Sequence, residues 1–230
     1  MSRAGNAVIE RTERQGEPPR PPAFLDRRLF LGDWGWLIRD PIDLLRATYY
    51  VGAVVLLLLG QFDDAVRLGL TAILVTLPRI ISVPRLFDLG FVIGMALQAW
   101  GNVFSLFTNL GWYDSLVHLT LSFWVAPLFY ICLARVEVVP DLTGPRKPSR
   151  NLVGILVVTL SLGLAFGACY EIYEWAVDKW LGGNLYISES DTALDLTLDC
   201  LGSAAGGALL VLWATRGWHT IRRLPASRID

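Results

Sequence analysis

The chain of 230 residues has few cysteines and little net charge. Its three cysteines, Cys132, Cys169 and Cys200, are too few and too scattered for a disulfide framework or a cysteine-rich zinc site. Each lies in an apolar run, so we expect all three to be small buried residues. The net charge of −1 argues against nucleic acid as a partner. Ser-His-Asp order, a phosphate-binding glycine loop and a Cys-x-x-Cys pair are also absent.

Charged residues are scarce as well, at 18% of the chain. A soluble domain usually has about a quarter. Hydrophobic residues make up 53%, and the mean hydropathy is +0.46. This composition argues against a soluble enzyme and favours a protein whose partner is the lipid bilayer.

The two ends of the chain are polar and basic. Residues 1–25 are rich in Arg, Glu and Pro without periodicity, which predicts a disordered cytoplasmic tail. No short apolar core with a cleavage site follows, which argues against a signal peptide. Residues 26–40 mix arginines with aromatic residues, as is typical of a juxtamembrane segment at the cytoplasmic membrane surface. Residues 217–230 form a basic cytoplasmic tail.

Residues 41–216 hold about six stretches that can cross a bilayer, for which a helix needs roughly 20 apolar residues. The second stretch is the weakest, because Arg67 and Arg79 leave a short apolar run between them. Asp40 and Pro41 predict the start of the first helix, with a capping side chain and a proline at the first helical position. The sequence therefore predicts an all-α, polytopic membrane helix bundle. The stretches are 42–62, 65–83, 86–107, 113–134, 152–178 and 193–215.

The distribution of basic residues provides an independent test of this helix count. With the N-terminus in the cytoplasm, all of the 20 Lys and Arg except Arg67 and Lys179 fall on the cytoplasmic side. The positive-inside rule predicts such a bias, which five or seven helices would scramble. We therefore expect six transmembrane helices in the plasma (inner) membrane, with both termini cytoplasmic. Asp88, near the cytoplasmic end of the third helix, is expected to pair with Arg85 or to cap that helix.

The ionisable residues inside the predicted helices concentrate in the outer half of the bilayer. The fourth, fifth and sixth helices each carry a pair at a spacing of three or four residues, which places both members on one helix face. The third helix adds Gln98 and Asn102, which are more often packing contacts than ligands. The three pairs are Asp114 with His118, Glu171 with Glu174, and Asp195 with Asp199.

Two of these helices also carry a glycine pair on the face of their acids. The pairs are Gly163 with Gly167 and Gly202 with Gly206. Such Gly-x-x-x-Gly elements let helix backbones approach closely in lipid. We expect the two pairs to meet near the middle of the membrane, which would gather the carboxylates just outside them.

Carboxylates gathered at membrane depth repel one another and lose hydration. Protonation, pairing with Lys179 or a bound cation would relieve this cost. A mixed shell of carboxylate and imidazole suits Mn, Fe or Zn, whereas an all-oxygen shell suits Mg or Ca. A divalent metal site is therefore the leading interpretation of this cluster, beside a proton relay and a solvated vestibule. Its candidate ligands are Asp114, His118, Glu171, Glu174, Asp195 and Asp199.

Three motifs in this region resemble the YjdF-like family of uncharacterised inner-membrane proteins, over roughly residues 100–205. The last two also resemble, more distantly, the VanZ-like group. The resemblance implies a multi-pass membrane protein with shared polar residues and no established reaction. The sequence departs from the YjdF-like pattern at Leu119-Thr120-Leu121, where that pattern has a glycine-containing turn. The motifs are Trp112-Tyr113-Asp114 with His118, Tyr170-Glu171 with Glu174-Trp175, and Asp191-Thr192 with Asp195-Leu196, Asp199 and Gly202.

The leading functional hypothesis is a membrane protein with a carboxylate-histidine cation site that faces the outer leaflet. If the protein is an enzyme, it acts on a lipidic substrate that it reaches from the outer leaflet. In it, His118 is a ligand or general base, Glu174 orients a water, and the remaining acids hold the metal. A transporter coupled to protons or metal ions is a rival hypothesis. A transporter would need polar residues that continue from the acid cluster to the cytoplasmic side. The sequence offers only Asp88 and Gln98 there, which counts against the transporter hypothesis. A non-catalytic membrane scaffold is a third hypothesis, and in a fourth the acid cluster is simply a solvated vestibule.

Overall fold

The structure, a computed structural model, describes residues 38, 40–81, 83–136, 138–139, 149–181 and 188–216. In this part of the chain the regular secondary structure is helical, with no strands, which confirms the all-α prediction. The predicted tails 1–25 and 217–230, and nearly all of the segment 26–40, lie outside the described residues. The helices are α3 (Pro41–Leu58), α4 (Phe62–Ile81), α5 (Arg85–Val103), α6 (Leu106–Asn109), α7 (Tyr113–Arg135), α8 (Ser149–Leu181) and α9 (Glu189–Arg216).

Each of the six predicted apolar stretches forms a long helix. By length and composition, five of these helices can cross a membrane: α3, α5, α7, α8 and α9. The helix α4, which corresponds to the weakest stretch, carries Asp63, Asp64, Arg67 and Arg79 and is not among them. A multi-pass membrane protein follows from this composition, while the orientation of the termini stays a prediction.

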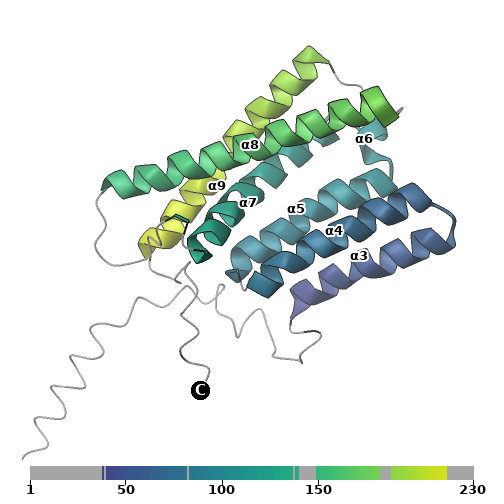
Figure 1. Cartoon of the computed structure of the whole chain (residues 1–230), viewed down its shortest axis with the longest axis horizontal. Helices are drawn as coiled ribbons and strands as arrows, with labels where there is room; N and C mark the ends of the chain where they lie inside the picture. Colours follow the sequence, from purple (N-terminus) through teal and green to yellow (C-terminus); the bar gives the residue numbers. More distant parts are fainter. Residues whose placement is uncertain are drawn as a thin grey trace, which may run out of the picture.

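The helices form two groups that meet along α5 and α7. Helices α3, α4 and α5 lie side by side, and α7, α8 and α9 form the second group (Figure 1). Within the second group, α9 packs against both α7 and α8. The starts of α7 and α9 and the end of α8 lie at one end of the bundle, opposite the start of α3 (Figure 1).

Helix α3 begins as predicted. Oδ1 of Asp40 accepts hydrogen bonds from the backbone N–H groups of Ile42 at 2.8 Å and Asp43 at 3.1 Å, and Pro41 is the first helical residue. The other oxygen of Asp40 accepts from Arg85. The capping side chain therefore also ties α3 to the start of α5.

A buried charge network continues from this cap. Arg46 pairs with Asp43 at 2.8 Å and with Asp88, and its Nε donates to the carbonyl of Val75 at 2.7 Å. Asp88 therefore pairs with Arg46 of α3, and the prediction that it pairs with Arg85 is wrong, because that arginine is engaged by the α3 cap.

The glycine pairs of α8 and α9 do not meet each other, which corrects the sequence prediction. A Cβ on Gly163 would overlap the Ser203 hydroxyl, and a Cβ on Gly167 would overlap the Asp199 carboxylate. The α8 glycines therefore make room for polar side chains of α9. The physical reason is volume, because these buried side chains need a surface without a Cβ opposite them.

The α9 glycines admit the backbone of α7 instead. A Cβ on Gly202 would overlap the carbonyl oxygen of Leu119, and a Cβ on Gly206 would overlap that of Phe123. Close packing at Leu119 therefore arises although α7 has no glycine there, because α9 supplies the space.

The cysteine prediction is wrong for Cys169. All three cysteines are free, and Cys169 is exposed on α8, whereas Cys132 and Cys200 are partly buried. In a helix that can span a membrane, an apolar run can face lipid instead of a protein core. Apolar neighbours therefore did not imply burial inside the protein.

Candidate metal centre

The site begins on the first two turns of α7. Asp114 and His118 are one helical turn apart and project from the same face, with Nε2 of His118 3.8 Å from Oδ1 of Asp114. His118 is buried, with 4% of its surface exposed, and Asp114 is partly buried. The histidine therefore lies inside the bundle, with Asp114 between it and the helix end.

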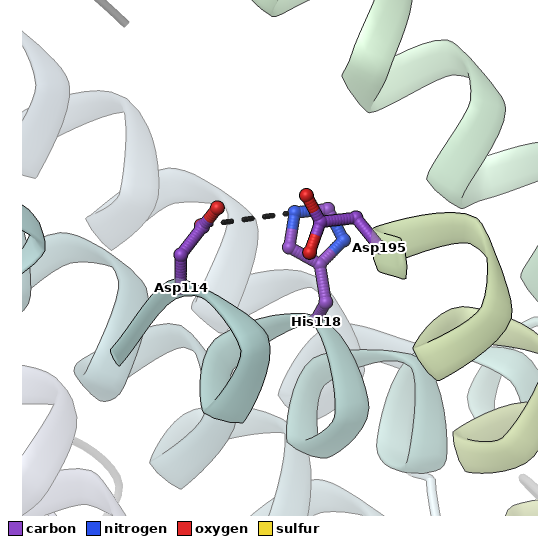
Figure 2. A group of neighbouring side chains, drawn as sticks. All are labelled: Asp114, His118 and Asp195. Atoms are coloured by element: carbon purple, nitrogen blue, oxygen red, sulfur yellow. Dashed lines mark ion pairs between the residues drawn. The ribbon is translucent and has the colours of Figure 1, made fainter. Parts of the chain in front are cut away.

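Carboxylates of α8 and α9 complete the cluster around this histidine. Oε1 of Glu171 lies 3.7 Å from Nε2 of His118. Potential ligand atoms of Asp114, His118 and Asp195 lie within 4.8 Å of one another, and Figure 2 shows the Asp195 carboxylate beside the imidazole ring. Potential ligand atoms of His118, Glu171 and Glu174 meet the same limit. The structure thus brings together acids of three helices around one histidine.

The register between α8 and α9 explains this convergence. Gly163 lies against Ser203 and Gly167 against Asp199, so a step of four residues along α8 matches a step of four back along α9. One more turn brings Glu171 level with Asp195. The antiparallel packing of two glycine-bearing helices therefore aligns their acids.

Asp199 lies at the other edge of the imidazole ring. Its Oδ2 is 3.2 Å from Nδ1 of His118, and its Oδ1 accepts a hydrogen bond from Ser122. Asp199 is buried, with 1% of its surface exposed. The predicted ligand set included Asp199, but the structure places this carboxylate at Nδ1, whereas Asp114 and Glu171 approach Nε2.

Two polar atoms in the centre of the cluster are buried without a hydrogen-bond partner. They are Nε2 of His118 and Oε1 of Glu171, whose separation of 3.7 Å is too long for a hydrogen bond. Buried polar groups are nearly always paired, so each exception needs an explanation. A buried Asp/His/Glu cluster of this kind can hold a metal ion.

The cluster is also strongly acidic. Its only basic partner among the ion pairs of the described residues is His118. Lys179, the one cation that the sequence offered for pairing, is exposed and forms no ion pair with these acids in the described part of the chain. A positive charge supplied from outside the chain would offset the repulsion.

Sequence reasoning missed the supporting roles of Ser122 and Tyr170. Ser122 follows His118 by one turn, so the spacing Asp114, His118, Ser122 was a usable signal. Tyr170 packs edge-on against the His118 ring, with centroids 5.6 Å apart, and its hydroxyl accepts a hydrogen bond from Gln98 of α5. Gln98 thus acts as a packing contact between the two helix groups.

A small pocket lies beside the imidazole ring of His118. It is lined by Val117, His118, Leu121, Ser122, Phe166, Gly167, Tyr170 and Asp199.

Comparison with known proteins identifies a family but no characterised relative. Residues 64–216 match the model of a family described as predicted membrane protein (DUF2238). This match is consistent with the resemblance to YjdF-like proteins, while the likeness to the VanZ-like group stays a prediction. No curated protein and no solved structure matches the chain.

Proposed function

The chain belongs to the DUF2238 family of predicted membrane proteins, and we propose that it binds a divalent metal ion at Nε2 of His118. The carboxylates of Asp114, Glu171 and Asp195 supply the remaining ligands. One observation carries this proposal: Nε2 of His118 and Oε1 of Glu171 are buried, unpartnered and 3.7 Å apart. An ion that contacts both would satisfy both.

The donor set favours a transition metal. One imidazole nitrogen with several carboxylate oxygens suits Mn, Fe or Zn, whereas Mg is more commonly bound by oxygen donors alone. The structure also supports the ligand role of His118 over the role of general base. Nδ1 is engaged by Asp199, and a metal ion bound at Nε2 would use the remaining lone pair, so neither nitrogen would be left to take a proton from a substrate.

For the reaction we propose metal-dependent hydrolysis of a lipidic substrate. The site lies near the ends of three helices that can span a membrane, so a lipid headgroup is the substrate within closest reach. A bound divalent ion would act as a Lewis acid and activate water. Glu174 is partly buried, and its potential ligand atom lies within 4.8 Å of those of His118 and Glu171, which suits a residue that orients the attacking water.

Metal analysis of the purified protein tests the proposed function. Wild type purified without chelators is expected to retain a stoichiometric amount of Mn, Fe or Zn, and His118→Gln and Glu171→Gln are expected to lose it. The matched control is Glu189→Gln, which neutralises an exposed acid of α9 outside the cluster and is expected to retain the metal. Wild type that neither retains a metal nor binds an added one contradicts the proposal.

A proton- or metal-coupled transporter is the second candidate, and one observation favours it. The hydroxyls of Ser203 and Thr159 are fully buried without a hydrogen-bond partner, and they continue from Asp199 toward the other end of the bundle. These two hydroxyls add polar groups on the side of the cluster where the sequence suggested only Asp88 and Gln98. Ion flux in proteoliposomes that is lost in Glu171→Gln would favour transport over hydrolysis.

A further inference from the structure

We propose that Asp199 is a positioning residue rather than a metal ligand. It holds the proton of the neutral His118 ring on Nδ1 and so presents the lone pair of Nε2 to the ion. The consequence for metal binding rests on the proposed function, whereas the position of the proton does not.

The geometry around the His118 ring distinguishes the positioning role of Asp199 from the ligand role of the other acids. Oδ2 of Asp199 faces Nδ1 at 3.2 Å, whereas Asp114 and Glu171 face Nε2 at 3.8 and 3.7 Å. A carboxylate at Nδ1 accepts the ring N–H and leaves Nε2 as the nitrogen that can bind a metal. Metal-binding histidines commonly have such a carboxylate behind them, and it orients the ring and raises its basicity.

Two neighbours hold Asp199 in this position. Ser122 donates to Oδ1, so the two oxygens of Asp199 are engaged by His118 and Ser122. Gly167 lies against the carboxylate, and a Cβ there would overlap Oδ2. The Asp199 carboxylate is therefore held by two residues of α7, His118 and Ser122. Gly167 on α8 leaves room for it because it has no Cβ.

The position of the ring proton can be measured without any metal. The chain has two histidines, so the His219→Gln variant labelled with ¹⁵N-histidine gives NMR signals from His118 alone. We expect the neutral ring to carry its proton on Nδ1 when Asp199 is present. In Asp199→Asn, the amide can donate to Nδ1, so the form protonated on Nε2 should appear. A wild-type ring protonated mainly on Nε2, or a distribution that Asp199→Asn leaves unchanged, overturns the proposal.

Metal affinity separates positioning from ligation. With Zn²⁺ as the probe, Asp199→Asn is expected to weaken binding roughly 10–100-fold, the usual effect of losing an outer-shell partner. Gly167→Ala keeps the negative charge but displaces the carboxylate, so it should also weaken binding. Ser122→Ala, which removes one hydrogen bond without adding volume, should have a smaller effect. Glu189→Gln should bind as wild type does.

Two results of this titration overturn the proposal. One is unchanged affinity in Asp199→Asn. The other is a loss in Asp199→Asn as complete as that of His118→Gln, because a direct ligand is expected to behave as His118 does. Size-exclusion profiles check that each variant is folded. If wild type binds no Zn²⁺, the proposed function fails, and the NMR measurement still decides the position of the proton.

Discussion

Nε2 of His118 on α7 and Oε1 of Glu171 on α8 face each other at 3.7 Å inside the bundle, and neither has a hydrogen-bond partner. Asp114 and Asp195 approach the same region from α7 and α9. Because the cluster is acidic and its only basic partner among the described residues is a histidine, a cation bound here would link three helices. Binding and stability should therefore be coupled.

The first prediction concerns thermal stability. A ligand that binds only the folded protein stabilises it, by about 2.7 kcal/mol at a concentration of 100 times its Kd. A strong chelator should therefore lower the Tm of wild type in detergent, and Mn²⁺ or Zn²⁺ should restore it. Glu171→Gln should show neither effect, whereas the exposed-acid control Glu189→Gln should show both. A wild-type Tm that is indifferent to chelator and metal contradicts this prediction.

The second prediction has the opposite sign and concerns the metal-free protein. Without a cation, the acids around His118 repel one another, so neutralising one of them should relieve that repulsion. Asp195→Asn is therefore expected to have a higher Tm than wild type when both are metal-free, and a lower Tm when metal is in excess. A variant less stable than wild type under both conditions would indicate that Asp195 has only a structural role.

The third prediction concerns the contact between α9 and α7. A Cβ at Gly202 or Gly206 would overlap a backbone carbonyl of α7, which cannot move as a side-chain tip can. Gly202→Ala and Gly206→Ala should each destabilise the protein by about 1–3 kcal/mol, the usual cost of overpacking. The control is Gly154→Ala on α8, where a Cβ meets open space and the gain in helix propensity is about 1 kcal/mol. Equal effects at the three positions would contradict this packing.

The fourth prediction concerns the charge network at the opposite end of the bundle. Arg46→Met leaves Asp88 without its buried partner, which should cost about 3–5 kcal/mol. The double variant Arg46→Met with Asp88→Leu should recover part of this loss, because it removes an uncompensated charge. Arg67→Met, an exposed arginine of α4, is the control and should change the unfolding free energy little. Similar losses for Arg46→Met and Arg67→Met would contradict the network.

The fifth prediction concerns orientation in the membrane. The distribution of basic residues predicts that both termini lie in the cytoplasm, so a reporter that is active only in the cytoplasm should be active when fused after Asp230. In intact cells, the site end of the bundle should react with a thiol reagent that does not cross membranes, for example at an introduced Glu189→Cys. If that position is labelled only after the membrane is opened, the site end of the bundle faces the cytoplasm, and the predicted orientation is wrong.

Helical spacing was sufficient to predict which residues share a face. The pairs Asp114 with His118 and Glu171 with Glu174 each contribute side chains to one cluster, and Asp40 with Pro41 marks the start of α3. These features depend on the periodicity and end chemistry of single helices. They could therefore be predicted without knowing how the helices pack.

Features that depend on two helices could not be predicted in this way. The α9 glycines face α7 and not α8, and Asp88 pairs with Arg46. Asp199 lies at Nδ1 of the imidazole, whereas Asp114 and Glu171 approach Nε2. The spacing within a helix leaves open its rotation and its register against a neighbour, and these two quantities decide which atoms meet.

Anomalous diffraction from crystals grown with metal retained tests the central claim most directly. Data collected on either side of the absorption edge of the metal show where that element lies. The account predicts an anomalous peak between Nε2 of His118 and the carboxylate of Glu171, and no such peak in Glu171→Gln. Metal-loaded wild-type crystals with no peak there, or with the metal at Nδ1 beside Asp199, would contradict it.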